Sequence, residues 1–138
     1  MYKAEQFLEG YKRADARVRR IESELRDLER DIDALGGQSD GQPRATVVRS
    51  RTEDMAIKLA DKRIKLVDAR MKAIDERAEV FEMIQSVEGT VEADVLYYRY
   101  IKNYDWEDIA ELVMYSRYWT QVIWRRGLSM VEEILRGR

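Results

Sequence analysis

Five side chains near the C-terminus have the types and the spacing needed to read base edges in double-stranded DNA. On a helical wheel they share one side, opposite an apolar stripe, and we call them the reading face: Arg117, Tyr118, Gln121, Val122 and Arg125. Arginine suits guanine edges, glutamine suits adenine, and an exposed valine can touch a thymine methyl group. Arg126 lies at the edge of this face, where a phosphate contact is more natural.

A reading face needs a helix held by a second helix, and the flanking sequence predicts both. A short helix capped by Asp105 has an apolar side made of Trp106, Ile109, Ala110 and Val113. The turn Met114-Tyr115-Ser116 follows, and Ser116 caps a longer helix that ends near Leu135. We expect Trp119, Ile123 and Met130 on its inner side. The small Ala110 fits the crossing point, so the segment predicts a helix-turn-helix.

The residues before this segment predict one more helix and a small aromatic core. Thr90 is the expected cap of a helix that ends near Asn103. Nine of the thirteen aromatic residues lie between residues 97 and 124, and we expect Tyr100, Trp106 and Trp119 in the core. Met114 stands where many such turns carry glycine. A left-handed backbone there costs a methionine on the order of 1 kcal/mol.

The N-terminal third predicts one long helix, over about residues 3–35. Its apolar residues alternate at spacings of three and four, the heptad pattern of coiled coils: Phe7, Tyr11, Ala14, Val18, Ile21, Leu25, Leu28, Ile32 and Leu35. Gly36 and Gly37 favour an end to this helix. Residues 36–50 form the expected linker, which contains the single proline.

A second long helix is expected over about residues 51–87, opened by a capping box of Ser50 and Glu53. It carries two apolar stripes. The first, which we call the 3-4 stripe, consists of Ile57, Ala60, Ile64, Val67, Met71, Ile74, Ala78 and Phe81. The second, the sevenfold stripe, consists of Leu59, Leu66, Ala73, Val80 and Val87. One stripe can face the first helix, and the other needs a further partner, so we expect Leu59, Leu66 and Val80 to be buried.

These patterns predict an all-α fold with two parts. Residues 1–88 form a long antiparallel helical hairpin with coiled-coil packing, because a short loop forces helices of similar length to run antiparallel. Residues 89–138 form a small three-helix domain that contains the helix-turn-helix.

Composition excludes several classes of function. The chain of 138 residues has no histidine and no cysteine, which removes imidazole and thiol catalysis and the usual zinc ligands. The acidic run Asp75, Glu76, Glu79 and Glu82 superficially resembles a magnesium-binding helix, but Glu76 and Glu79 face mostly away from the seam, as on a solvated helix surface. We therefore predict no enzyme, no catalytic residue, no metal and no cofactor. No apolar run is long enough to cross a membrane, so a cytoplasmic location is expected.

The C-terminal third resembles a known group of regulators. The run Tyr98-Arg99-Tyr100-Ile101-Lys102-Asn103-Tyr104-Asp105-Trp106-Glu107-Asp108-Ile109-Ala110, with Tyr115-Ser116 and Gly127-Leu128, is similar to small phage-encoded late transcription regulators of the ArpU and RinA kind. That part of those proteins resembles region 4 of bacterial sigma factors, which reads the −35 promoter element and touches RNA polymerase. The resemblance implies promoter binding, with the reading face as the base-contacting surface and a bacterial host cell as the location.

The sequence thus predicts a sequence-specific, DNA-binding transcription regulator. We expect the charge-balanced hairpin to serve either self-association as a homodimer or a contact with RNA polymerase. A runner-up is a phage packaging component like a small terminase subunit, although such proteins usually place the DNA-binding part first. A third reading is a purely structural coiled-coil protein, which would have no affinity for DNA.

Overall fold

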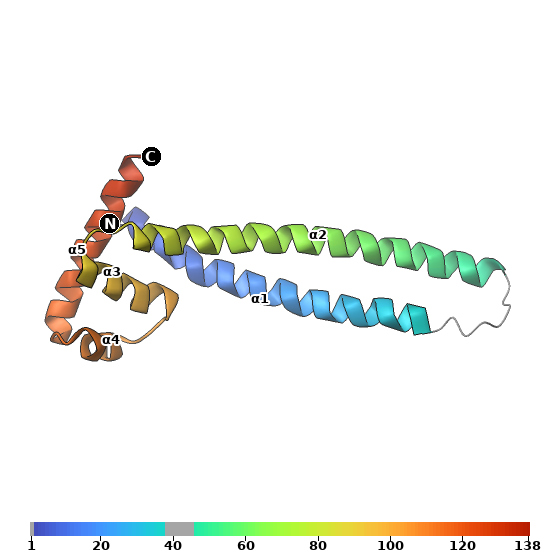
Figure 1. Ribbon diagram of the computed structural model, residues 1–138, viewed down its shortest axis with the longest axis horizontal. Helices are drawn as coiled ribbons and strands as arrows, with labels where there is room; N and C mark the ends of the chain where they lie inside the picture. Colours follow the sequence, from blue (N-terminus) through green and yellow to red (C-terminus); the bar gives the residue numbers. More distant parts are fainter. Residues whose placement is uncertain (1, 38–45) are drawn as a thin grey trace. The chain divides into compact units, whose positions relative to one another are not determined.

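The computed structural model describes residues 2–37 and 46–138, and every element in those ranges is helical (Figure 1). The prediction of an all-α fold is confirmed. Two long helices come first, α1 (Tyr2–Gly37) and α2 (Thr46–Gln85). Shorter elements follow: α3 (Thr90–Leu96), the π-helix η1 (Tyr97–Ile101), α4 (Trp106–Val113) and α5 (Arg117–Arg136).

Several predicted boundaries shift. α2 begins at Thr46, so Ser50 lies inside the helix and is not its cap. Gly36 and Gly37 form the last turn of α1, and the remainder of the expected linker, residues 38–45, lies outside the described residues. The cap of α3 is Gly89 and not Thr90, which is the first helical residue. The helix expected to reach Asn103 changes to π geometry at Tyr97, where the Lys102 N–H donates to the Tyr97 carbonyl at 3.1 Å.

The chain divides into two compact units. One contains residues 1–15 and 74–138, and the other contains residues 16–73. The boundary expected at residue 88 lies inside the first unit, because the start of α1 and the end of α2 share its core. That core contains Ala4, Leu8, Val80, Met83, Ile84, Val87, Leu96, Leu128 and Val131. The Ala4 N–H also donates to the Glu132 Oε2 atom at 3.0 Å, which ties α1 to α5.

In the unit of residues 16–73, the two long helices run antiparallel. Arg63 of α2 forms an ion pair with Glu29 of α1 at 3.6 Å. Ile32 and Leu35, which follow Glu29 on α1, line a hollow with Thr52 and Ala56, which precede Arg63 on α2. Later residues of α1 thus lie beside earlier residues of α2. The predicted apolar face of α1 points inward here, with Val18, Ile21, Leu25 and Leu28 buried.

The two stripes of α2 differ in their exposure to solvent. On the sevenfold stripe, Ala73, Val80 and Val87 are buried, while Leu59 and Leu66 are half-buried. On the 3-4 stripe, Ile57, Ile64, Met71 and Phe81 are exposed, while Val67 and Ile74 are half-buried. The sevenfold stripe therefore turns toward α1, and the more regular 3-4 stripe remains on the outside.

Charge explains which stripe faces α1. Acids recur every seven residues beside the seam of α1, as an acidic row of Asp15, Glu22 and Glu29. Arginines recur on α2 between members of the sevenfold stripe, as an arginine row of Arg63, Arg70 and Arg77. Arg77 bonds to Asp15 at 3.1 Å, Arg63 forms the ion pair with Glu29 at 3.6 Å, and both Arg70 and Glu22 are half-buried. If the 3-4 stripe faced α1, its own flanking acids at positions 61, 68 and 75 would face the acidic row, and like charges would repel.

We predict that the Arg77–Asp15 pair stabilises the fold more than a surface pair does. Its side chains are only 33% and 23% exposed, so solvent screens the attraction incompletely. A double-mutant cycle with Arg77→Ala and Asp15→Ala, followed by urea unfolding, should give a coupling free energy of about 1 kcal/mol. The control is the exposed Lys72–Asp68 pair on α2, with an N–O distance of 3.6 Å. Its coupling should be below about 0.5 kcal/mol, and equal couplings for the two pairs would contradict the prediction.

Candidate nucleic-acid interface

The reading face belongs to the first turns of α5, which has a well-formed N-terminus. Ser116 is the cap, as predicted, and its Oγ atom accepts a hydrogen bond from the Trp119 N–H at 3.2 Å. The Thr120 hydroxyl donates to the Ser116 carbonyl at 2.8 Å, so this polar side chain is satisfied although it is fully buried. These bonds fix the direction in which α5 leaves the turn.

Helices α3, α4 and α5 each pack against the other two (Figure 1). Val95, Ile109 and Ile123 are buried where they meet, with Trp106 and Trp124 packed against them. Further along α5, a Cβ atom added at Gly127 would lie only 3.1 Å from two atoms of the buried Leu96 side chain. Glycine at residue 127 therefore allows α5 to approach α3 closely.

The turn between α4 and α5 is left-handed at Met114. This residue has φ 64° and ψ 38°, and its side chain is 90% exposed. Its N–H donates to the Ala110 carbonyl, as does the N–H of Tyr115 at 3.1 Å. These bonds close the C-terminus of α4 in the manner of a glycine-capped helix, but with a methionine in the strained position. Asp105 is the N-cap of α4 by position, although its side chain makes no capping hydrogen bond.

The reading face lies on the outer side of α5 but is unevenly exposed. Arg117, Tyr118 and Arg125 are exposed, whereas Gln121 and Val122 are half-buried. The buried side of α5 is formed by Thr120, Ile123, Gly127, Leu128 and Val131. Between residues 115 and 131 the sequence contains no acidic residue, so all the ionised side chains of this stretch are arginines.

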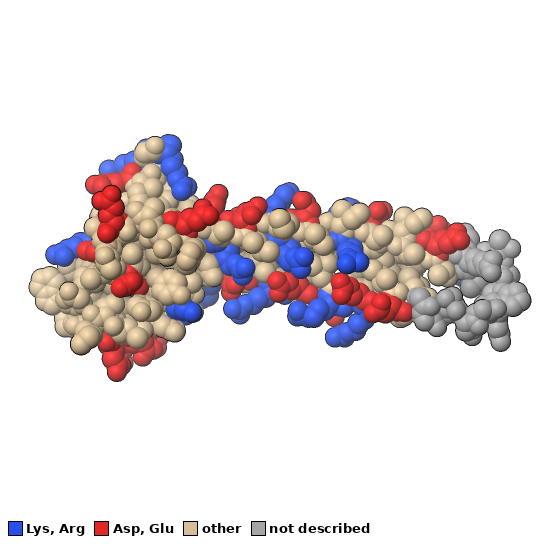
Figure 2. Space-filling view, in the orientation of Figure 1, with Lys and Arg blue, Asp and Glu red and all other residues tan. Residues whose placement is uncertain are grey.

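The prediction that Trp119 belongs to the core is wrong, because half of its side chain (51%) is exposed. Thr120 and Gly127 occupy the inner side of α5 instead, and this rotates Trp119 outward. Its ring lies 5.8 Å from that of Tyr118, which is 71% exposed. Three more exposed apolar side chains lie nearby, Leu112 at the end of α4 and Met114 and Tyr115 in the turn. Figure 2 accordingly shows a largely uncharged surface over the end of α4 and the start of α5.

The other two expected core aromatics are half-buried. The Tyr100 hydroxyl accepts a hydrogen bond from the Trp124 indole N–H at 3.0 Å. Burial raises the pKa of Tyr100, and this outweighs the Trp124 hydrogen bond, which lowers it. Trp106 lies under the Arg99 guanidinium, 4.7 Å from the ring centre, and Arg99 also donates to the Tyr104 carbonyl at 3.0 Å. Arg99 thus links η1 to the start of α4.

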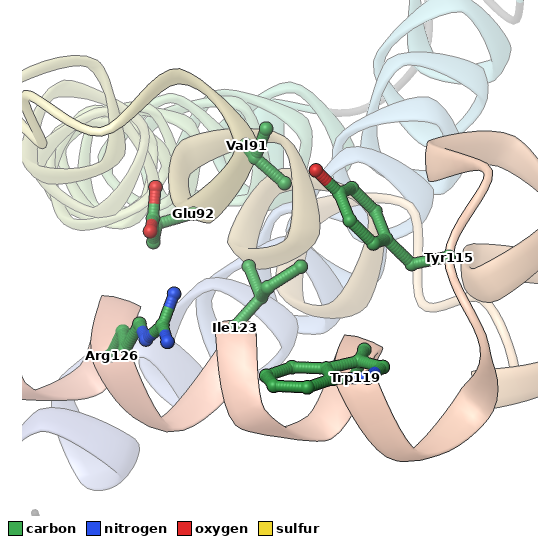
Figure 3. A pocket seen from close by; sticks show the side chains of 6 residues that line it. All are labelled: Val91, Glu92, Tyr115, Trp119, Ile123 and Arg126. Atoms are coloured by element: carbon green, nitrogen blue, oxygen red, sulfur yellow. The ribbon is translucent and has the colours of Figure 1, made fainter.

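A hollow of about 530 Å³ opens beside the reading face, between α3 and α5. Figure 3 shows the aromatic side chains of Tyr115 and Trp119 at one end and the charged side chains of Glu92 and Arg126 at the other. Arg126, expected to meet phosphate, therefore lies on the far side of this hollow from the turn.

Carboxylates lie on the outer side of α4. Glu107, Asp108 and Glu111 are all exposed, and Glu107 forms an ion pair with Arg117 at 3.8 Å. Glu107 and Asp108 lie in the first turn of α4, a position that the sequence pattern alone already indicates. The first arginine of the reading face is thus partly neutralised within the protein.

The described residues contain no group of three or more acidic side chains arranged to hold a metal ion. Over the same ranges, none of the helices combines the length and the apolar character required to traverse a bilayer. No family model matches the chain, and neither a curated protein nor a solved structure matches it.

We predict that Met114→Gly stabilises the protein by about 0.5–1 kcal/mol, because glycine adopts a left-handed backbone without the Cβ penalty. Thermal or urea unfolding measures the change. Leu112→Gly is the matched control, since residue 112 is also exposed but lies in right-handed helix. There, glycine should destabilise by about 1 kcal/mol. If both variants are less stable than the unmodified protein, the Met114 side chain contributes more to the free energy of unfolding than its left-handed backbone costs.

Proposed function

We propose that this chain is a sequence-specific DNA-binding transcription regulator, in which α4, the turn and α5 act as a helix-turn-helix. The observation that carries the proposal is the outer side of α5. It begins at a capped N-terminus directly after a three-residue turn, and it presents Arg117, Tyr118 and Arg125 to solvent in a stretch without acids. In DNA-binding helix-turn-helix proteins, this part of the second helix enters the major groove.

The chemistry of the exposed side chains supports a base-reading role. Arg117 and Arg125 offer bidentate donors to guanine, and Gln121 offers an amide to adenine. Tyr118 and Val122 provide apolar surface for thymine methyl groups. A protein surface seldom exposes an aromatic pair such as Tyr118 and Trp119 unless another molecule binds there.

The electrostatics favour selective binding to particular DNA sequences over tight binding to DNA of every sequence. The whole chain has a net charge of −2, and the acids of α4 lie close to the reading face. Non-specific affinity comes mainly from phosphate neutralisation, so it should be weak here. Base contacts, and a second protein bound at the same promoter, would then supply the selectivity. Bacterial RNA polymerase is the candidate for such a protein, on the resemblance to sigma region 4.

We expect the chain to bind one or a few promoter-bearing fragments from its own genome in preference to random duplex. Fluorescence anisotropy across a salt series measures this. Arg117→Ala/Arg125→Ala should weaken specific binding at least tenfold, since each lost guanine contact costs about 1–3 kcal/mol. The matched control is Arg26→Ala/Arg30→Ala on exposed positions of α1, which changes the net charge equally.

Three results would contradict this proposal. Equal loss of affinity in the two double variants would show a general charge effect and no base reading. The absence of any preference at low salt, with no capture of purified RNA polymerase, would favour a structural protein. A ring-like oligomer that binds DNA ends or packaging sites would favour the small-terminase alternative.

We also predict that Glu107→Gln strengthens binding to DNA. The change removes the carboxylate 3.8 Å from the Arg117 guanidinium and releases that arginine for DNA. Affinity for random duplex at low salt should rise severalfold, with a steeper dependence on salt. Glu24→Gln on an exposed position of α1 is the control and should leave binding unchanged. If the two variants behave alike, α4 does not lie near the DNA.

A further inference from the structure

The 3-4 stripe of α2 has the properties of an unsatisfied coiled-coil seam. Four of its six large members are far more exposed than apolar residues in a helix pair usually are: Ile57 is 61% exposed, Ile64 67%, Met71 54% and Phe81 42%. The other two, Val67 and Ile74, are half-buried. Ala60 and Ala78 are exposed as well. The spacing of three and four residues holds over the whole stripe, which is the pattern that buries one helix against another of the same kind.

Hollows border the stripe inside each unit. In the unit of residues 16–73, Ala60 and Ile64 line a hollow of about 610 Å³ together with Ile32 and Leu35 of α1. In the other unit, Ile74, Ala78 and Phe81 line a hollow of about 410 Å³ with Tyr11. A second helix that packs along the stripe would cover these hollows together with the exposed side chains.

Charged residues flank the stripe in an ordered way. In heptad terms, with Ile57 at position a and Ala60 at position d, the e positions are Asp61, Asp68, Asp75 and Glu82, an acidic row of α2. The g positions are the arginine row, Arg63, Arg70 and Arg77. Each side of the stripe therefore carries a single sign of charge. Charges at e and g positions select the partner and the orientation of a coiled coil.

This arrangement suits a parallel pairing of α2 with an identical helix. In a parallel pair, each g residue meets the e residue five positions later on the other helix, so Arg63 meets Asp68, Arg70 meets Asp75, and Arg77 meets Glu82. In an antiparallel pair, e meets e and g meets g, so acids would face acids and arginines would face arginines. The arginines that already bond to α1 retain donors for a second carboxylate, because a guanidinium has five N–H groups.

We propose that the chain forms a homodimer through the 3-4 stripe, with α2 parallel and in register with α2 of a second copy. The interface buries the eight residues of the stripe, and the arginine row of each copy pairs with the acidic row of α2 in the other. Parallel pairing brings the two copies of the segment that follows α2 to the same end of the dimer. The inference rests on α2 alone and does not depend on the proposed DNA binding.

Sedimentation and light scattering on the full chain test the dimer. The unmodified protein should have twice its monomer mass of 16.4 kDa. Ile64→Glu/Met71→Glu should give 16.4 kDa at the same concentration, with unchanged helicity by circular dichroism, because both side chains are exposed within one copy. The control Lys65→Glu changes the net charge by the same amount beside the stripe and should remain dimeric.

Disulfide cross-linking tests the orientation, and the lack of natural cysteine removes any background. In a parallel pair, Ile57→Cys and Phe81→Cys should each cross-link to itself on mild oxidation, since equivalent positions face each other at disulfide distance. In an antiparallel pair, neither variant would cross-link to itself, and a mixture of the two would cross-link only in the register that places residue 57 opposite residue 81. Three results would overturn the proposal. They are a failure of both variants to cross-link to themselves, a monomeric unmodified protein, and a dimer that survives Ile64→Glu/Met71→Glu.

Discussion

The antiparallel pairing of the arginine row of α2 with the acidic row of α1 is the constraint on which much of the structure depends. The partly buried pair of Arg77 and Asp15 is its strongest contact, and Arg63 and Glu29 add an exposed ion pair. These pairs favour an inward position for the side of α2 that carries the sevenfold stripe, on which Ala73, Val80 and Val87 are buried. They also leave the longer 3-4 stripe outside. Charge complementarity thus favours one apolar side of α2 for packing on α1 and leaves most of the other exposed.

The first unit depends on a different kind of contact, the close approach of α5 to α3. Gly127 permits this approach, and Thr120 accepts burial because its hydroxyl bonds to the preceding turn of backbone. Together they set the rotation of α5 about its own axis. That rotation carries Trp119 to the surface beside Tyr118 and keeps Gln121 and Val122 partly covered. The candidate interface is aromatic as well as basic because two small residues, Thr120 and Gly127, occupy the buried side of α5.

The 3-4 stripe of α2 and the reading face of α5 are different surfaces, so a homodimer of the chain could use both at once. A parallel dimer through α2 would present two copies of α5, and two reading helices can engage two half-sites on one DNA duplex. Cooperative use of two weak sites would also fit the small net charge, because specificity would then come from the sum of base contacts and not from phosphate attraction.

The sequence by itself determined the helical class, the inward face of α1, the cap at Ser116 and the outward direction of Arg117 and Arg125. These features follow from local rules: heptad spacing, capping chemistry and the 3.6-residue period act on neighbours within one helix. The sequence also contained both stripes of α2, and local rules left open which of the two packs on α1. Only the tertiary structure decided that choice, since it depends on charges of α1 that are distant in sequence. It also decided that Trp119 is exposed, because the packing of α5 on α3 favoured a threonine and a glycine over a tryptophan on the buried side.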